Sequence, residues 1–239
     1  MHALTASGIV LALLATLEIA APLPDPRWVL LWLGLAVVID AADGPLARAV
    51  DIERRAPAID GRTIDDIIDY LTFTFIPPLL VLRMSWAMEP DWLAFAAVAF
   101  AMAASLFGFA HRMAKDERAG FFRGFPSYWN LMAYYFGLWV AYYGAAGRVA
   151  VTVLLVGLAV LTLTPLRFVY PNMAPQRWKT PLLLGGAAWG VVLVAALPWY
   201  PNPHDPEGSI PSWLMWSSLV YPAVYVAASL HLDRRARAR

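Results

Sequence analysis

Four aspartates between residues 40 and 69 have the type and the spacing to hold a metal ion. Asp40 and Asp43 are three residues apart, so both side chains project from one face of a helix. Asp65 and Asp69 are four residues apart and share a face in the same way. One loop joins the two helices, which lets them bring the pairs to a similar depth. We therefore expect the four carboxylates to form one cluster.

A carboxylate cluster at membrane depth needs positive charge beside it. An ionised carboxylate in a bilayer costs several kcal/mol unless it is paired, and neighbouring carboxylates also repel one another. Arg48 alone cannot neutralise four of them, whereas one or two divalent cations can. Oxygen ligands with no adjacent His or Cys favour magnesium, manganese or calcium over zinc. For Asp51, Glu53 and Asp60, in the connecting loop, we prefer the simpler interpretation that they start helices or face water. Asp66 stays open.

Small residues border the same four aspartates. Gly44 and Ala47 lie one turn beyond the first pair, and Gly61 lies one turn before Asp65. They leave room for a ligand to approach the backbone, and Arg48 lies beside them. Metal ions can bridge phosphoryl oxygens in a displacement reaction, while a nearby carboxylate takes a proton from the attacking hydroxyl. The arrangement therefore suits a diphosphate substrate.

The chain resembles the CDP-alcohol phosphotransferases, whose signature is D-x2-D-G-x2-A-R followed by G-x3-D-x3-D. The matching residues are Asp40, Asp43, Gly44, Ala47, Arg48, Gly61, Asp65 and Asp69. The spacer between the two halves, residues 49–60, has twelve residues instead of the usual eight or nine. This longer spacer, the eight predicted spans and the length resemble the bacterial phosphatidylcholine synthases of that family.

The resemblance implies a reaction and roles for the matched residues. The phosphatidyl group of CDP-diacylglycerol would pass to choline, with release of CMP. The four aspartates would hold two divalent ions, Mn²⁺ or Mg²⁺, and Asp69 would also be the general base on the choline hydroxyl. The residues that would border CDP are Gly44, Ala47, Arg48 and Gly61. The resemblance also implies a homodimer in the bacterial inner membrane.

Aromatic residues at 128–130 are candidates for choline recognition. A quaternary ammonium has a fixed charge and no N–H donor, so proteins bind it with aromatic faces. Tyr128, Trp129 and Asn130 begin the fifth predicted span and are our candidate contacts. The alternative is an ordinary interfacial aromatic belt. Segments 5–8 and 124–130 carry a softer part of the resemblance.

The elements that position these residues are membrane helices. Of the 239 residues, 60% are hydrophobic and only 15% are charged, and the mean hydropathy is +0.57, so the chain is predicted to be an all-α integral membrane protein in one domain, 1–239. Eight apolar runs fit spans: 4–21, 28–50, 63–81, 92–111, 128–144, 149–166, 181–197 and 212–232. Pro77 and Pro78 should kink the third.

A net charge of +1 gives no reason to expect nucleic acid as a partner, and the absence of cysteine excludes disulfides and thiolate sites.

Basic residues set the expected orientation. They gather in the second, fourth and sixth loops and at the carboxyl end, whereas the opposite loops hold only Arg27, Arg83 and Arg148. The positive-inside rule therefore places both termini in the cytoplasm, and the four aspartates face the same side.

Two alternatives stay open at this point. Within the family, the acceptor could be serine, inositol or glycerol phosphate instead of choline. A cation transporter would also use intramembrane carboxylates, but it would need acidic or polar residues continuing toward the far side of the bilayer. Glu18 is the only acid in the apolar runs that lies toward that side.

Overall fold

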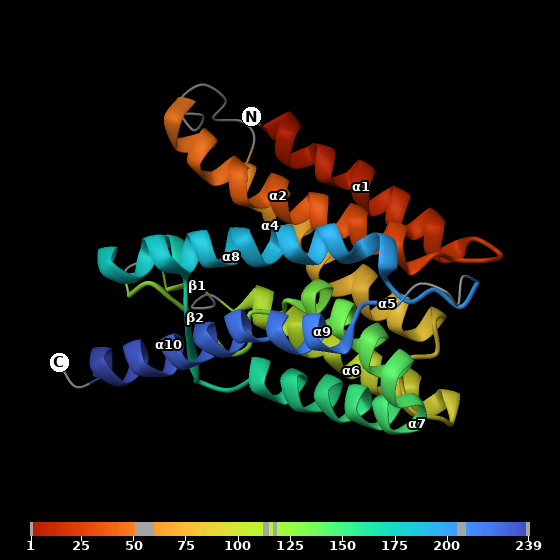
Figure 1. Cartoon of the computed structure of the whole chain (residues 1–239). Helices are drawn as coiled ribbons and strands as arrows, with labels where there is room; N and C mark the ends of the chain where they lie inside the picture. Colours follow the sequence, from red (N-terminus) through yellow and green to blue (C-terminus); the bar gives the residue numbers. More distant parts are fainter. Residues whose placement is uncertain (1, 51–59, 112–114, 117–118, 205–208, 238–239) are drawn as a thin grey trace.

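The computed structural model describes residues 2–50, 60–111, 115–116, 119–204 and 209–237, with the side chains of 2–3, 43–50 and 115–116 left out. Helices make up most of it, as the sequence predicts (Figure 1). In chain order they are α1 (His2–Ala20), α2 (Pro26–Val50), α4 (Gly61–Asp69), η1 (Tyr70–Phe75), α5 (Ile76–Arg83), α6 (Asp91–Ala110), α7 (Trp129–Thr162), η2 (Pro171–Met173), α8 (Gln176–Ala196), η3 (Leu197–Trp199), α9 (Ser212–Ser218) and α10 (Val220–Arg237).

Apolar side chains cover much of the outside of the helices. Leu13, Phe107 and Leu184 are each more than half exposed, which suits contact with lipid. Within the described residues, four helical segments are long and apolar enough to cross a membrane. They are Asp91–Ala110, Trp129–Thr162, Gln176–Trp199 and Ser212–Arg237, and Leu4–Ala20 is a shorter apolar helix. The chain is a multi-pass membrane protein.

Two predicted spans are joined in α7. Its residue Gly144 has φ 53° and ψ −122°, a backbone conformation that glycine tolerates and a helix does not. Gly147 lies directly against the backbone carbonyl of Trp139, so the chain turns back on itself. Figure 1 shows the two halves running in opposite directions. The predicted helices at 128–144 and 149–166 are therefore both present, although the total of eight spans stays a prediction.

The third predicted span is interrupted by a π-helical segment, η1, between α4 and α5. Pro77 and Pro78 follow it and have no N–H to donate, and the ring of an internal proline also crowds the carbonyl four residues earlier. A wider turn relieves this crowding, and the Ile76 N–H donates to the carbonyl of Leu71, five residues back. The sequence predicts a distortion at this proline pair, and its form is a widened turn directly after Asp69.

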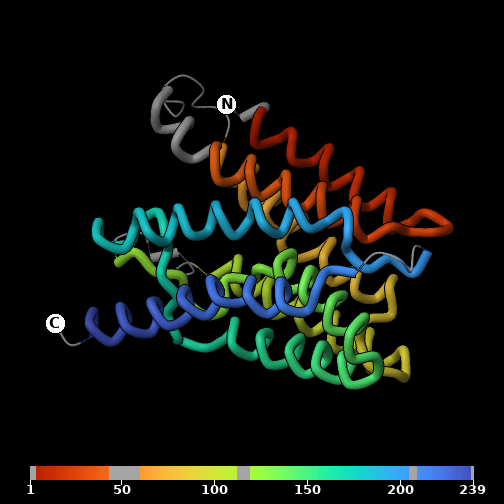
Figure 2. The backbone as a smooth tube through the Cα atoms, in the orientation of Figure 1, coloured from red at the N-terminus to blue at the C-terminus, as the bar shows by residue number. Residues whose placement is uncertain are grey.

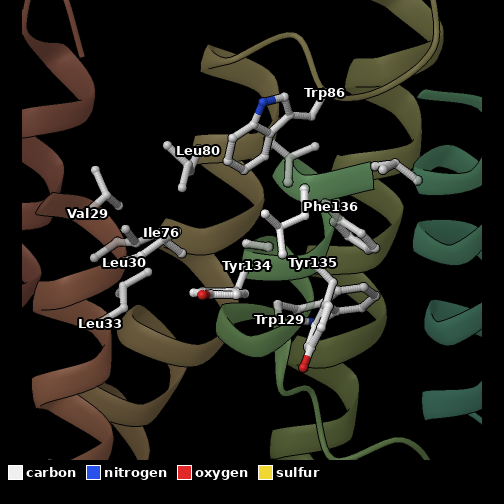
Figure 3. Packing of buried hydrophobic residues seen from close by; sticks show 14 of the residues in the cluster. Val29, Leu30, Leu33, Ile76, Leu80, Trp86, Trp129, Tyr134, Tyr135 and Phe136 are labelled. Atoms are coloured by element: carbon white, nitrogen blue, oxygen red, sulfur yellow. The ribbon is translucent and has the colours of Figure 1, made fainter. Parts of the chain in front are cut away.

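The main hydrophobic core lies between α2, α5 and the first half of α7 (Figure 3). Val29, Leu33 and Leu80 are almost fully buried there. Gly137 in α7 allows the closest approach, because a Cβ at this position would lie 2.1 Å from the hydroxyl oxygen of Tyr200 and 2.6 Å from the ring of Trp86. The core therefore fixes the first half of α7, which begins at the candidate site.

A small antiparallel sheet is an addition to the predicted all-α fold. Its strands are β1 (Lys115–Asp116), β2 (Phe121–Arg123) and β3 (Arg167–Val169), in the order β1-β2-β3. Phe121 pairs with Val169, and Phe122 pairs with Phe168. The guanidinium of Arg167 donates to the carboxylate of Asp233, which ties β3 to α10. The strands have two or three residues each, too few to give an alternating pattern in the sequence.

The chain reverses at two ends of the bundle. At one end, which we name the site end, the Gly124 N–H donates to the carbonyl of Leu166 at 2.6 Å. At the opposite end, the Arg83 guanidinium donates to the carbonyl of Ile19 at 3.1 Å, and Arg148 pairs with Glu89 at 3.2 Å. The start of α1 and the end of α10 both lie toward the site end, on the left in Figure 2.

Candidate active site

Three of the four predicted aspartates meet at the site end. Asp40 comes from α2, and Asp65 and Asp69 come from successive turns of α4. One carboxylate oxygen of each lies within 4.8 Å of the others, and all three side chains are half-buried. We name these three residues the carboxylate triad. The side chain of Asp43 lies outside the described residues.

Asp60 sets the start of the helix that carries two members of the triad. Its Oδ1 accepts from the backbone N–H groups of Arg62 at 3.0 Å and Thr63 at 3.3 Å, and its Oδ2 accepts from the Thr63 hydroxyl at 2.7 Å. This is an N-cap, as we interpreted Asp60 from the sequence. The Thr63 hydroxyl hydrogen bond is the main reason why the pKa of the Asp60 carboxyl lies below its usual value. Asp51 and Glu53 lie outside the described residues.

The start of α1 forms a wall beside the triad. Gly8 lies so close to α4 that a Cβ there would be 2.6 Å from the Cγ2 of Ile68. A small cavity lies between α1, α2 and α4. It is lined by Thr5, Gly8, Ala36, Ile39, Asp40, Asp65, Ile68, Asp69 and Thr72. The sequence indicates this wall only weakly, through the softer resemblance in segment 5–8.

The triad fits a hard divalent cation. Magnesium and calcium bind oxygen ligands at about 2.0–2.6 Å, so two ligands on opposite sides of one ion are about 4–5 Å apart. A spread of 4.8 Å between the triad oxygens is within that range. The cluster offers carboxylate oxygen only, a donor set that favours magnesium, manganese or calcium. These three residues could therefore hold a metal ion.

The other residues of the predicted site are placed in part. Gly61 is the first residue of α4, one turn before Asp65. Gly44, Ala47 and Arg48 belong to α2 by their backbone, but their side chains lie outside the described residues. Asp66 does not belong to the triad. It lies 4.0 Å from the Arg62 guanidinium, and both residues line a separate groove with His111, Arg123 and Ser127.

The three candidate choline contacts have different surroundings. The ring of Tyr128 packs against that of Phe73, four residues after Asp69, with centroids 6.1 Å apart. Trp129 lies in the hydrophobic core (Figure 3) and is only 1% exposed. Its indole N–H donates to the Ser105 hydroxyl at 2.8 Å. Asn130 is also buried, and its side-chain oxygen accepts from the Leu131 N–H. Tyr128 is thus the candidate beside the triad, and the role of Trp129 and Asn130 in choline binding stays a prediction.

The isolated acid toward the far side of the bilayer has a local structural partner. The Glu18 carboxylate accepts from the backbone N–H of Asp25 at 2.8 Å, within the turn between α1 and α2. This turn is at the opposite end of the bundle from the triad. The contact accounts for Glu18 without an ion pathway, so it gives the transporter alternative no support.

Comparison with known proteins finds a consistent set of relatives. The phosphatidylcholine synthase of Pseudomonas aeruginosa is 39% identical over 181 residues, which cover 74% of this chain and 70% of that protein. The phosphatidylcholine synthase of Bradyrhizobium diazoefficiens is 33% identical over 202 residues, covering 82% and 70%. That of Rhizobium meliloti is 34% identical over 199 residues, covering 82% and 77%. No protein-family model matches the chain. No solved structure matches it either.

Proposed function

Because the chain belongs to the phosphatidylcholine synthase family, we propose that it transfers the phosphatidyl group of CDP-diacylglycerol to choline and releases CMP. The observation that carries this proposal is the carboxylate triad. Asp40 belongs to the first half of the family signature and Asp65 and Asp69 to the second, 25 and 29 residues further along the chain, and one carboxylate oxygen of each lies within 4.8 Å of the others. Such a cluster can serve a reaction at a diphosphate.

We assign the metal-binding role to the triad together with Asp43. Two divalent ions, Mn²⁺ or Mg²⁺, are the cofactor that suits four carboxylates and a diphosphate substrate. When bound, they would offset the negative charge of the diphosphate and of the departing CMP. The residues that we assign to the CDP moiety are Gly44, Ala47, Arg48 and Gly61.

Asp69 is the residue that we assign to proton transfer. Its carboxylate would accept the proton of the choline hydroxyl while the choline oxygen attacks the phosphorus that bears diacylglycerol. The bond from this phosphorus to the CMP oxygen breaks, and CMP leaves with that electron pair. Asp69 is the last residue of α4, directly before the π-helical turn, in which Phe73 packs against Tyr128. Tyr128, with Trp129 and Asn130, is our candidate for contact with the choline headgroup.

We place the reaction at the cytoplasmic face of the bacterial inner membrane. The basic loops support this orientation, because the positive-inside rule puts them in the cytoplasm together with both termini. Gly124 and Arg167 mark two of these loops, and both lie at the site end. We further propose one domain with eight spans, and a homodimer, as the family resemblance implies.

An acceptor series tests the proposed function. The purified protein in detergent would receive CDP-diacylglycerol, Mn²⁺ or Mg²⁺, and one of four acceptors: choline, serine, inositol or glycerol phosphate. We expect CMP release with choline and little with the others. Release with serine but not choline would contradict the choline assignment. If no acceptor gave CMP, the transferase itself would be excluded and the transporter would become the better hypothesis.

A further inference from the structure

Four aromatic residues from separate segments lie together at the site end. They are Phe122 of β2, Tyr128 before α7, Tyr170 after β3 and Tyr225 of α10. The ring centroids of Phe122 and Tyr128 are 6.5 Å apart with planes at 83°, and those of Phe122 and Tyr170 are 4.5 Å apart. The Tyr225 hydroxyl lies at the backbone carbonyl of Val169, the residue before Tyr170. We name this group the aromatic recess.

The small sheet and α10 hold the recess in place. The Tyr225 hydroxyl donates to the backbone carbonyl of Val169 at 2.9 Å, and the Val169 N–H donates to the Ser229 hydroxyl at 3.1 Å. The Tyr170 N–H donates to the carbonyl of Gly120 at 2.9 Å, which continues the pairing of β2 with β3. These bonds join the sheet to α10, so the rings are fixed relative to one another.

The recess is joined to the helix that carries the triad. The ring of Tyr128 packs against that of Phe73 in η1, with centroids 6.1 Å apart, and Phe73 lies four residues after Asp69. All four residues of the recess are partly exposed. Aromatic faces attract a cation that lies within about 6 Å of the ring centroid, and nearby carboxylates add to the attraction. The surroundings therefore suit an organic cation next to the reacting groups.

We infer that the aromatic recess binds the trimethylammonium group of the acceptor and selects a quaternary amine over a primary one. Only two carbons separate the hydroxyl of choline from its nitrogen, so a cation held against Tyr128 keeps the hydroxyl near Asp69. A primary ammonium would lose hydrogen bonds to water that the rings cannot replace, whereas a quaternary ammonium has none to lose. This inference rests on the proposed function and names the residues that set its acceptor specificity.

Substitution at Tyr170 tests the recess without touching the triad. The Tyr170→Leu variant should raise the KM for choline about 2–30-fold, the fold-change that a cation–π contact is usually worth. Its KM for CDP-diacylglycerol should not change. Tyr170→Phe keeps the ring and should raise the KM for choline less than Tyr170→Leu does. 3,3-Dimethylbutan-1-ol, the uncharged analogue of choline, should be a poor acceptor. Its rate of transfer should be the same in the wild type, Tyr170→Leu and Tyr170→Phe.

A matched control separates this effect from general damage. Tyr143 is 47% exposed and lies in the first half of α7, at the end away from the triad. The Tyr143→Leu variant should leave the KM values for choline and CDP-diacylglycerol unchanged. An equal rise in the KM for choline and for CDP-diacylglycerol in Tyr170→Leu would overturn the inference. So would an unchanged KM for choline.

Inhibition by tetramethylammonium tests the recess in the wild type, in case Tyr170→Leu does not fold. We expect it to compete with choline and not with CDP-diacylglycerol, and a lack of competition would overturn the inference. The two proposals fail separately. A wild-type protein that uses choline but shows no competition contradicts only the recess, whereas one that uses serine instead of choline contradicts the proposed function and the recess together.

Discussion

Asp69 differs from the other aspartates of the triad in its place on the helix. It ends α4, so the next backbone turn is the widened one that begins at Tyr70. Phe73 in this turn packs against Tyr128 of the aromatic recess, with ring centroids 6.1 Å apart. Asp65 is one turn farther from the recess. A hydroxyl group that enters from the recess would therefore meet Asp69, which is why we assign the proton transfer to this residue.

Replacement of this carboxylate should affect turnover more than substrate binding. The Asp69→Asn variant is expected to lower kcat about 10²–10⁴-fold, the usual contribution of a general base. Binding of CDP-diacylglycerol should be largely kept, because Asp40 and Asp65 remain. The rate of CMP release would measure kcat, and competition by CMP would measure the binding of CDP-diacylglycerol. Asp66→Asn is the control, since Asp66 is in the same helix but pairs with Arg62 in another groove. An equal loss of kcat in Asp69→Asn and Asp66→Asn would show that Asp69 is not the general base.

The sequence predicts the triad well and the recess poorly. Asp65 and Asp69 are four residues apart on one helix, so their shared face follows from helical geometry. Asp40 joins them because one loop connects their helices. Phe122, Tyr170 and Tyr225, in contrast, are 48 to 103 residues apart, and spacing says nothing about contacts over such lengths. Only Tyr128, at the start of a predicted span, could be proposed from its position.

The turn between β2 and α7 is the element on which the recess most depends. Gly124 has φ +74°, and a Cβ there would lie 2.1 Å from the backbone carbonyl oxygen of Thr162. The neighbouring Phe125 N–H donates to the carbonyl of Leu161. The end of α7 and the start of its first half are thus packed together through this glycine. The turn therefore fixes where Phe122 and Tyr128 lie.

A methyl group at this turn should destabilise the protein. Gly124→Ala adds both the cost of a positive φ and a clash with backbone that cannot move alone, which together should cost at least about 2 kcal/mol. Thermal unfolding in detergent would detect the loss as a lower Tm. Gly157→Ala is the control in the same helix, because a Cβ at Gly157 meets nothing within 4 Å. A Gly124→Ala variant as stable as Gly157→Ala would show that the turn adapts.

The helices are predictable from the sequence, but the structure of the segments that connect them is not. Apolar runs locate both halves of α7, and the proline pair locates the distortion in the third span. The spacer between the two halves of the signature, residues 49–60, can also be read from the sequence, and its first two residues end α2. The three short strands have no such pattern, because pairing with a partner strand, and not local propensity, makes Arg167–Val169 extended.

At the scale of the whole molecule, the two ends of the bundle should face opposite sides of the membrane. The triad, the sheet and the basic loops share the site end, whereas Glu89 and Arg148 pair at the other. In the orientation that we propose, choline would reach the triad from the cytoplasm and CDP-diacylglycerol would reach it from the membrane. The proposed orientation rests on the distribution of basic residues among the loops.

Single cysteines can test this orientation because the chain has none of its own. Ala146 at the opposite end and Ala236 at the site end are both exposed, so Ala146→Cys and Ala236→Cys form a matched pair. A membrane-impermeant thiol reagent should label the first in intact cells and the second only after the cells are opened. The reverse pattern would place the triad on the periplasmic side.

The central claim is that the carboxylate triad carries the transfer of a phosphatidyl group to choline. The most direct measurement feeds deuterated choline to a bacterial host whose membranes lack phosphatidylcholine, and follows the labelled lipid by mass spectrometry. We predict labelled phosphatidylcholine with the wild-type chain and at least about 100-fold less with Asp69→Asn at equal protein levels. Absence of labelled lipid with the wild type, or equal amounts with the variant, would contradict it.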